Sequence, residues 1–194
     1  MQFKSNKAFI LASASPRRKE LFSMLQIPFQ IETANVDEQS TPFYSDVQYV
    51  EDVAKLKTTA IAKKFPNEVV IGADTIVAFE GRLLHKPTST DEAIKHLQAL
   101  SGKTHFVYTA VVIAQGEQQM SFVEKTAVTF RELSLPFIEA YVATKDPFDK
   151  AGGYGIQTIG TLLVEKIEGD YNNVVGLPLS KLTNYLLAEN IISL

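Results

Sequence analysis

The pattern of hydrophobic and polar positions divides the chain into two parts. In the first part, short apolar runs alternate with stretches that have helical spacing, and from Thr104 two long runs around Gly116 predict a β-hairpin. The expected strands are Phe9–Ala12, Phe29–Thr33, Val69–Phe79, Arg82–His85, Thr104–Ala114, Ser121–Phe130 and Thr161–Ile167. The expected helices are Pro16–Leu25, Asp46–Lys64, a helix from Thr90 that ends before Gly102, Ser134–Thr144 and Pro178–Glu189. This order predicts an α/β fold with helices on a mixed β-sheet.

Two of these helices have expected caps and faces. Asp46 is the expected cap of the long helix, and Thr90 is the expected cap of the helix before Gly102. In the long helix, the side expected to be buried carries Val47, Val50, Ala54 and Ile61.

The start of the first helix predicts an anion site. Ser15 followed by Pro16 is typical of an N-cap and the first helical position. Arg17 and Arg18 then lie in the first turn, where the helix dipole disfavours cations by about 0.3–1 kcal/mol each. Free backbone N–H groups, two guanidinium groups and the hydroxyls of Ser13 and Ser15 would suit a phosphate. The alternative is a pair of solvated surface arginines.

Asp74 is the second candidate for chemistry, because it lies inside the apolar run Val69–Phe79. A buried carboxylate costs several kcal/mol unless it is paired, hydrogen-bonded or bound to a cation. It could hold a metal or activate water, or it could be a structural aspartate paired to a lysine or capping a turn. Gly72 would permit a bulge or the close approach of a ligand. In an ideal strand Thr75 points away from Asp74, so both could face one site only at a bulge or a strand end.

Composition bounds the function. The 194 residues suffice for one domain with a substantial core, and 45% hydrophobic and 21% charged residues are typical of a globular protein. A net charge of −3 argues against non-specific nucleic-acid binding through a basic surface. With no cysteine, disulfides, thiolate zinc sites and cysteine nucleophiles are excluded. No signal peptide or membrane span is expected, so the predicted location is the cytoplasm.

Six motifs together resemble one known family. They are Leu11–Leu21, Ile71–Val77, Lys86–Pro87, Leu100–His105, Asp149–Gln157 and Val174–Pro178. In this order they resemble the Maf family, the septum-formation-protein family of nucleoside triphosphate pyrophosphatases. The resemblance implies one domain over residues 1–194, with an elongated mixed β-sheet flanked by helices and two lobes around a central cleft, as in ITPase-like proteins. It also implies a divalent metal cation, Mg²⁺ or Mn²⁺, and a homodimer.

The resemblance also implies roles for individual residues. Asp74 would activate water and, with Glu38, hold the metal. Phosphates would be bound by Arg17, Arg18, Lys57 and Lys86, in keeping with the anion site that includes Ser13. Arg17, Thr75 and Gln157 match family positions associated with base choice. From the sequence alone, an acidic residue in a loop such as Glu38, or a lone lysine, is usually only solvated.

The segment Asp149–Gln157 is glycine-rich but matches neither a dinucleotide-binding fingerprint nor a Walker A loop. Its glycines are therefore expected to shape a loop near a base. Gln157 offers a donor and an acceptor, which suits the imide edge of uracil or thymine, and the motif resembles the subgroup acting on dTTP and UTP. Thr158 stands where family members often have glycine. The alternative is an ordinary tight loop with a surface glutamine.

The predicted function is hydrolysis of dTTP or UTP to the monophosphate and pyrophosphate. Modified pyrimidine nucleotides or another base are further candidates, because canonical and damaged pyrimidines share the imide edge. The alternative from a different class is a non-catalytic nucleotide- or partner-binding regulator of septum formation. That alternative predicts binding without turnover and an exposed apolar patch.

Overall fold

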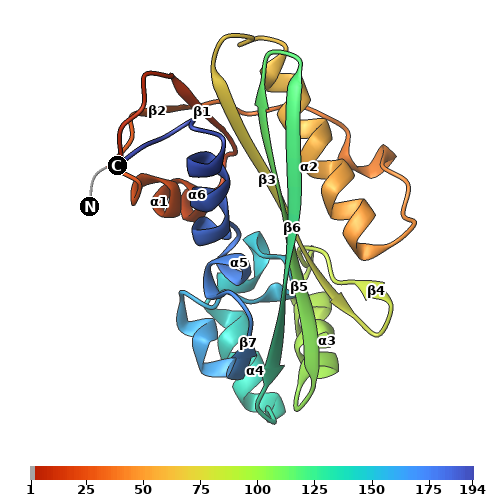
Figure 1. Cartoon of the computed structure of the whole chain (residues 1–194). Helices are drawn as coiled ribbons and strands as arrows, with labels where there is room; N and C mark the ends of the chain where they lie inside the picture. Colours follow the sequence, from red (N-terminus) through yellow and green to blue (C-terminus); the bar gives the residue numbers. More distant parts are fainter. Residues whose placement is uncertain (1–2) are drawn as a thin grey trace. The chain divides into compact units, whose positions relative to one another are not determined.

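The computed structural model describes residues 3–194, except for the side chain of Gln39. In this range the strands form a seven-stranded sheet in the order β2–β1–β3–β5–β6–β7, with β4 paired to β3 (Figure 1). The strands are β1 Phe9–Ala12, β2 Phe29–Ile31, β3 Val69–Phe79, β4 Arg82–Leu83, β5 Thr104–Gln115, β6 Gln118–Phe130 and β7 Val164–Glu168. Because β1 is parallel to β2 and β3, whereas β4 and β7 pair antiparallel, the predicted mixed sheet is confirmed.

Helices flank this sheet, as the sequence predicted. The α-helices are α1 Pro16–Ser23, α2 Asp46–Ala62, α3 Thr90–Leu100, α4 Leu135–Ala143, α5 Tyr171–Val175 and α6 Leu179–Ala188. Short 3-10 helices cover Glu38–Ser40, Asp146–Asp149, Ala151–Gly153 and Ile159–Leu163. No helix within residues 3–194 has the length and apolar character needed to cross a membrane.

The chain divides into two compact units, each containing part of β3, β5 and β6. The first comprises the residues up to Asp74, Thr109–Glu124 and Gly176–Leu194. The second comprises Thr75–Tyr108 and Lys125–Val175.

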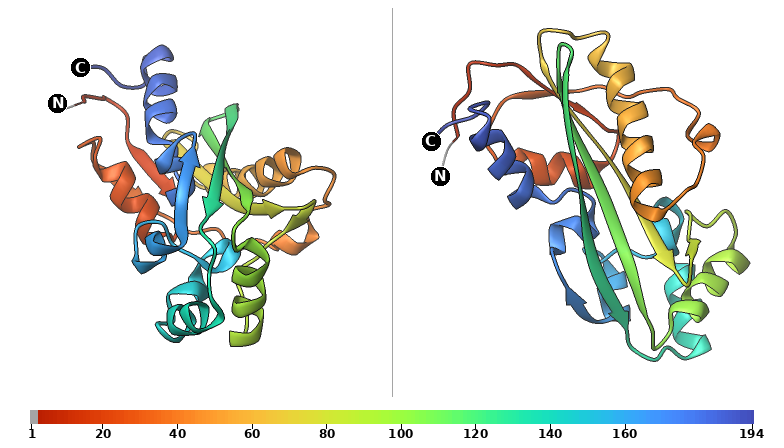
Figure 2. Two further views of the ribbon diagram at one scale, coloured as in Figure 1. Left: turned by 90° about the horizontal axis from the view of Figure 1, so that it is seen from below. Right: turned by 45° about the vertical axis from the view of Figure 1, so that its right-hand side comes forward.

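The first unit has helices on both faces of β1. The ring centroids of Phe9 and of Phe22 in α1 lie 6.2 Å apart. Ile10, the next residue, packs instead in a cluster with Ile61 of α2 and Val70 of β3. Figure 2 shows α1 and α2 on opposite sides of β1. Successive residues of a strand point to opposite faces, so this double cover explains why β1 is a continuous apolar run rather than an alternating one.

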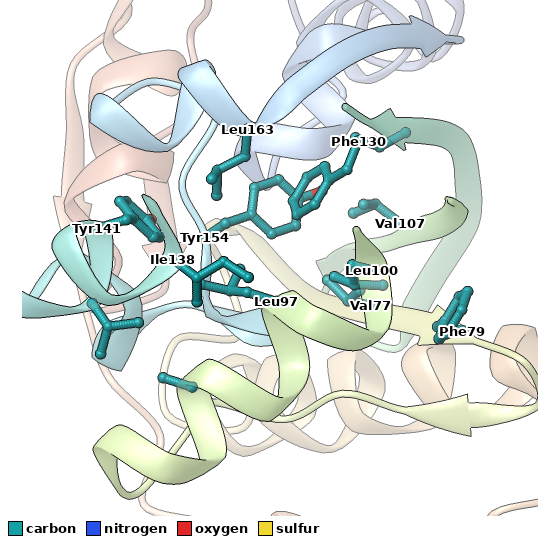
Figure 3. Close-up of a cluster of buried hydrophobic side chains, with 13 residues drawn as sticks. Val77, Phe79, Leu97, Leu100, Val107, Phe130, Ile138, Tyr141, Tyr154 and Leu163 are labelled. Atoms are coloured by element: carbon teal, nitrogen blue, oxygen red, sulfur yellow. The ribbon is translucent and has the colours of Figure 1, made fainter. Parts of the chain in front are cut away.

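The second unit has its own core between α3, α4 and the sheet. It contains Leu97 of α3, Ile138 of α4, Phe130 of β6 and two residues from the later segment, Tyr154 and Leu163. Figure 3 shows the Tyr154 ring beside Phe130 and Leu163, and the Tyr154 and Phe130 rings meet nearly edge to face at 4.8 Å. The core therefore fixes the start of the segment that leads to Gln157.

One histidine, His105, is buried against this core, with its ring edge to face with that of Phe130. His105 is fully buried, and its Nε2 lies 2.8 Å from the Tyr154 hydroxyl oxygen. Burial lowers the pKa of His105 to about 4, so the ring is neutral at pH 7. The bond joins the motif Leu100–His105 to the glycine-rich motif Asp149–Gln157.

Several local predictions are confirmed and several are wrong. The Ser15 hydroxyl caps α1 at the backbone N–H of Arg18, as predicted. Ser45 and Ser89 cap α2 and α3, in place of Asp46 and Thr90, which begin the helices instead. A serine one residue earlier competes better because its short side chain reaches the free N–H groups from an extended backbone.

Two predicted details of side chain and strand limits also differ. Val47 is 46% exposed, because it lies in the first turn of α2, whereas Val50, Ala54 and Ile61 are buried as predicted. The predicted strand Thr161–Ile167 begins three residues later, at Val164, because residues 159–163 form a 3-10 helix.

Candidate active site

The anion site predicted at the start of α1 is organised by two serine hydroxyls. The Ser13 hydroxyl accepts hydrogen bonds from the Ser15 N–H and from Arg18 Nη1, both over 3.2 Å. Arg18 Nε donates to the carbonyl of Gly176 over 2.8 Å. Two independent partners therefore fix the direction of the Arg18 guanidinium at the N-terminal end of α1, where the backbone N–H groups favour an anion.

Arg18 also lies within electrostatic reach of the acidic candidates. Burial lowers the pKa of Arg18. The negative charge of Asp74 opposes that shift, the positive charge of the neighbouring Arg17 adds to it, and the negative charge of Glu38 opposes it. A guanidinium ordinarily titrates so far above neutral pH that it remains charged. Three other predicted site residues, Arg17, Glu38 and Asp74, are thus close enough to influence Arg18.

Lys57 joins the two carboxylates. Its Nζ lies 2.7 Å from Asp74 Oδ1 and 2.8 Å from Glu38 Oε2. The side chains of Lys57 and Asp74 are only 18% and 13% exposed, whereas that of Glu38 is 50% exposed. The partly buried carboxylate of Asp74 therefore has a charged partner, which offsets the cost of placing it in an apolar strand.

The spacing of β3 explains why Asp74 meets α2. Val70 packs against α2, and alternate residues of a strand share a face, so Gly72 and Asp74 face the same helix. A Cβ added to Gly72 would lie 2.0 Å from Thr58 Oγ1. Gly72 therefore permits the close approach of α2, not of a ligand, and this brings Lys57 to Asp74.

The bulge considered at Gly72 is absent from the pairing of β1 with β3, whose register runs unshifted from Phe9↔Val69 to Ala12↔Gly72. Thr75, which follows Asp74, is half-buried and belongs to the second unit. A bulge at Gly72 therefore does not turn Thr75 and Asp74 toward one site.

Sequence reasoning missed Tyr49 in α2. The pKa of its hydroxyl is raised, first by burial and then by the negative charges of Asp74 and Glu38, while Lys57 opposes the shift. Its ring also packs against Phe43 at a centroid distance of 5.8 Å. The available signal was its place about two turns before Lys57 on the same predicted helix.

Asp74 and Glu38 are the residues that could hold a divalent cation. Both carboxylates reach the same ammonium nitrogen, so their oxygens lie close to one point. Mg²⁺ commonly takes one or two carboxylates and completes its shell with water and substrate phosphates. Within residues 3–194 no group of three or more His, Cys, Asp or Glu side chains could form an all-protein metal site. The donor set fits a metal that is bound together with a phosphate.

The other predicted site residues lie in the second unit, and two of them are on segments held together there. The Gly152 N–H donates to the carbonyl of Leu84 over 2.9 Å, and a Cβ added to Gly153 would lie 3.6 Å from Pro87 Cγ. The segment carrying Lys86 thus packs against the glycine-rich loop that leads to Gln157. The side chains of Lys86 and Gln157 are both exposed.

Comparison with known proteins shows the family to which the chain is similar. A family model described as Maf-like protein matches residues 8–189. A Bacillus cereus protein named dTTP/UTP pyrophosphatase is 48% identical over 180 residues, which are 93% of this chain and 94% of the relative. A Bacillus anthracis protein of the same name is 48% identical over 185 residues, 95% and 97% of the two chains.

A solved structure described as a HAM1 protein from Coxiella burnetii shares the fold. It superimposes with a TM-score of 0.52 over 94% of this chain and 99% of that one, at 13% sequence identity. At this identity the likeness concerns the fold alone.

Proposed function

This chain belongs to the Maf family, and from that premise we propose that it is a nucleoside triphosphate pyrophosphatase that acts on dTTP and UTP. The observation that carries the proposal is the contact of Lys57 with both Asp74 and Glu38, within electrostatic reach of Arg18. If Asp74 were only structural, its ion pair with Lys57 would be enough to compensate its charge. The carboxylate of Glu38 on the same lysine adds a negative charge that the stability of the fold does not require. The two relatives named dTTP/UTP pyrophosphatase support the same activity.

The basic residues of the site would bind the triphosphate. Arg18 presents a guanidinium held by Ser13 and Gly176 at the N-terminal end of α1, where the helix dipole favours an anion. Arg17, Lys57 and Lys86 would add positive charge, so the four cations would match about four negative charges on a metal-free triphosphate. Phosphate oxygens would replace one carboxylate as the partner of Lys57.

Asp74 would act as the general base. Its carboxylate accepts the proton of the water that attacks the α-phosphorus, the bond from that phosphorus to the bridging oxygen breaks, and pyrophosphate leaves. Asp74 and Glu38 would hold Mg²⁺ or Mn²⁺, which when bound neutralises phosphate charge and lowers the pKa of a bound water. Arg17, Arg18 and Lys86 would stabilise the negative charge of the leaving pyrophosphate.

The base would be read by Gln157, with Arg17 and Thr75 contributing to base choice. The carboxamide can donate to a carbonyl of uracil or thymine and accept from the N3–H at the same time. Cytosine lacks that N3–H, so the amide oxygen would lose its donor. We further expect a homodimer in the cytoplasm.

The test is release of pyrophosphate from a panel of dTTP, UTP, CTP and 7-methyl-GTP, with Mg²⁺ and with EDTA. Wild-type protein should release pyrophosphate rather than orthophosphate from dTTP and UTP, only with the metal. Asp74→Asn should lose about 10²-fold or more in turnover. Asp52→Asn is the matched control, because Asp52 lies on α2 and its Oδ1 accepts a hydrogen bond from Gln48 Nε2 over 2.8 Å. Absence of turnover on all four substrates would overturn the proposal, as would near wild-type turnover in a folded Asp74→Asn protein.

A further inference from the structure

A polar cluster with a buried side at Tyr141 and Lys150 and an exposed side at Thr158 lies next to Gln157 in the second unit. We name it the Asp146 cluster, and it comprises Tyr141, Asp146, Lys150 and Thr158. Asp146 Oδ2 accepts hydrogen bonds from the hydroxyls of Tyr141 and Thr158, each over 2.6 Å. Asp146 Oδ1 lies 3.0 Å from Lys150 Nζ, and the two side chains are 14% and 8% exposed.

The carboxylate of Asp146 is a charged, well-satisfied acceptor. Burial alone would raise its pKa, but hydrogen bonds from Thr158, Tyr141 and Lys150 outweigh burial and the pKa is lowered. Lys150 is held in place in turn by the Asp146 carbonyl over 2.8 Å and by Asp149 Oδ1 over 2.6 Å. Charge-assisted bonds of this kind are stronger than neutral ones and fix geometry.

Both ends of the turn that carries Gln157 are tied to this carboxylate. The turn runs from Gly155 to Thr158, with the Thr158 N–H donating to the Gly155 carbonyl over 3.3 Å. The Gly155 N–H donates to the Tyr141 hydroxyl over 3.3 Å, and the Thr158 hydroxyl contacts Asp146 directly. Between these two points, Ile156 is buried and Gln157 is exposed. The cluster therefore holds the backbone on each side of an exposed carboxamide.

Packing leaves this turn little freedom. A Cβ added to Gly155 would lie 2.4 Å from Lys150 Cε and 2.7 Å from Thr158 Oγ1. A Cβ added to Gly160 would lie 2.7 Å from the Tyr141 hydroxyl oxygen. The chain thus fits closely around the cluster on both sides of Gln157, and a displaced turn would meet these atoms.

We propose that Thr158 is a positioning residue for base discrimination: through its hydroxyl bond to Asp146 it holds the turn so that the Gln157 carboxamide meets the imide edge of uracil or thymine. The inference rests on the proposed function and deepens it. A misplaced carboxamide would keep its chemistry but lose the paired donor and acceptor geometry, so binding of uracil would weaken while cytosine, which never made the full pair, would change little.

The test compares Thr158→Val, which removes the hydroxyl at similar volume, with Thr158→Ser, which keeps it. Thr161→Val is the matched control, because Thr161 is an exposed residue three positions along the chain and outside the cluster. Equilibrium binding of UMP and CMP measures discrimination without catalysis, kcat and KM for UTP and CTP measure it with catalysis, and binding of inorganic pyrophosphate measures the phosphate site.

Thr158→Val should lower the UMP preference over CMP by about fivefold, the effect of losing one good hydrogen bond. The change should appear in KM for UTP more than in kcat, with pyrophosphate binding unchanged. Thr158→Ser and Thr161→Val should retain the wild-type preference. An unchanged preference for UMP over CMP in Thr158→Val overturns the inference. An equal loss of affinity for UMP, CMP and pyrophosphate in this variant also overturns it. A wild-type protein that binds UMP and CMP equally well overturns it too. Wild-type discrimination in binding without any hydrolysis would instead overturn only the proposed activity, and the effect of Thr158→Val on binding would still decide the inference.

Discussion

Gly72→Ala tests whether close packing of α2 on β3 brings Lys57 to Asp74. The added methyl would lie 2.0 Å from Thr58 Oγ1 and 3.1 Å from Thr58 Cβ. Thr58 is fully buried, and its hydroxyl donates to the Ala54 carbonyl over 2.7 Å, so the side chain cannot turn aside freely. The helix or the strand must therefore move.

Overpacking of this kind costs about 1–3 kcal/mol. Taking about 2 kcal/mol, the melting temperature should fall by about 4–8 °C for a chain of this size. Activity should fall as well, because Lys57 precedes Thr58 and moves with it. Urea-induced unfolding gives the free energy of unfolding, and pyrophosphate release gives the activity.

The second variant, Thr58→Ala, identifies the cause of the loss. In Gly72→Ala/Thr58→Ala the nearest remaining side-chain atom would be the Cβ of residue 58, 3.1 Å from the added methyl, so a shift of a few tenths of an ångström suffices. A double-mutant cycle should show that Thr58→Ala restores about 1 kcal/mol or more of the stability lost in Gly72→Ala. The reasoning is refuted if Gly72→Ala is as stable as wild type. It is also refuted if Gly72→Ala lowers the free energy of unfolding equally with threonine and with alanine at position 58.

Three further outcomes are expected. Arg18→Ala should lower the free energy of unfolding without nucleotide by about 1–3 kcal/mol in urea titrations, because the bonds to Ser13 and Gly176 are lost; unchanged stability would contradict the observed bonds. Because the pKa of His105 falls to about 4 on folding, the unfolded state binds more protons, and wild type should lose about 3 kcal/mol of unfolding free energy between pH 7 and pH 4. Urea titrations across this range should give His105→Gln a smaller loss, and an equal slope would refute the assignment. Wild type should favour UTP over CTP by about tenfold or more in kcat/KM, and Gln157→Leu should shrink that ratio; equal slowing of both substrates would indicate a loop-shaping role.

The sequence determined the features that depend on near neighbours. Ser15 and Pro16 specify the start of α1, because a cap and a fixed proline φ act within one turn. Glu80 and Gly81, which separate two expected strands in the sequence, have positive φ angles and make the turn between β3 and β4. Asp74 could be singled out because one carboxylate inside an apolar strand is costly wherever that strand packs.

Tertiary structure decided the partners. Glu38, Lys57 and Asp74 come from a loop, a helix and a strand, and their contact depends on how α2 packs on β3. Gly72 illustrates the limit, since the sequence indicated that something approaches closely there but not that it is Thr58. Thr158 was noted only as a departure from the family pattern, and its bond to Asp146 became visible with the fold. Periodicity reports which face of an element is buried, whereas the partner across that face is chosen by the packing of segments distant in sequence.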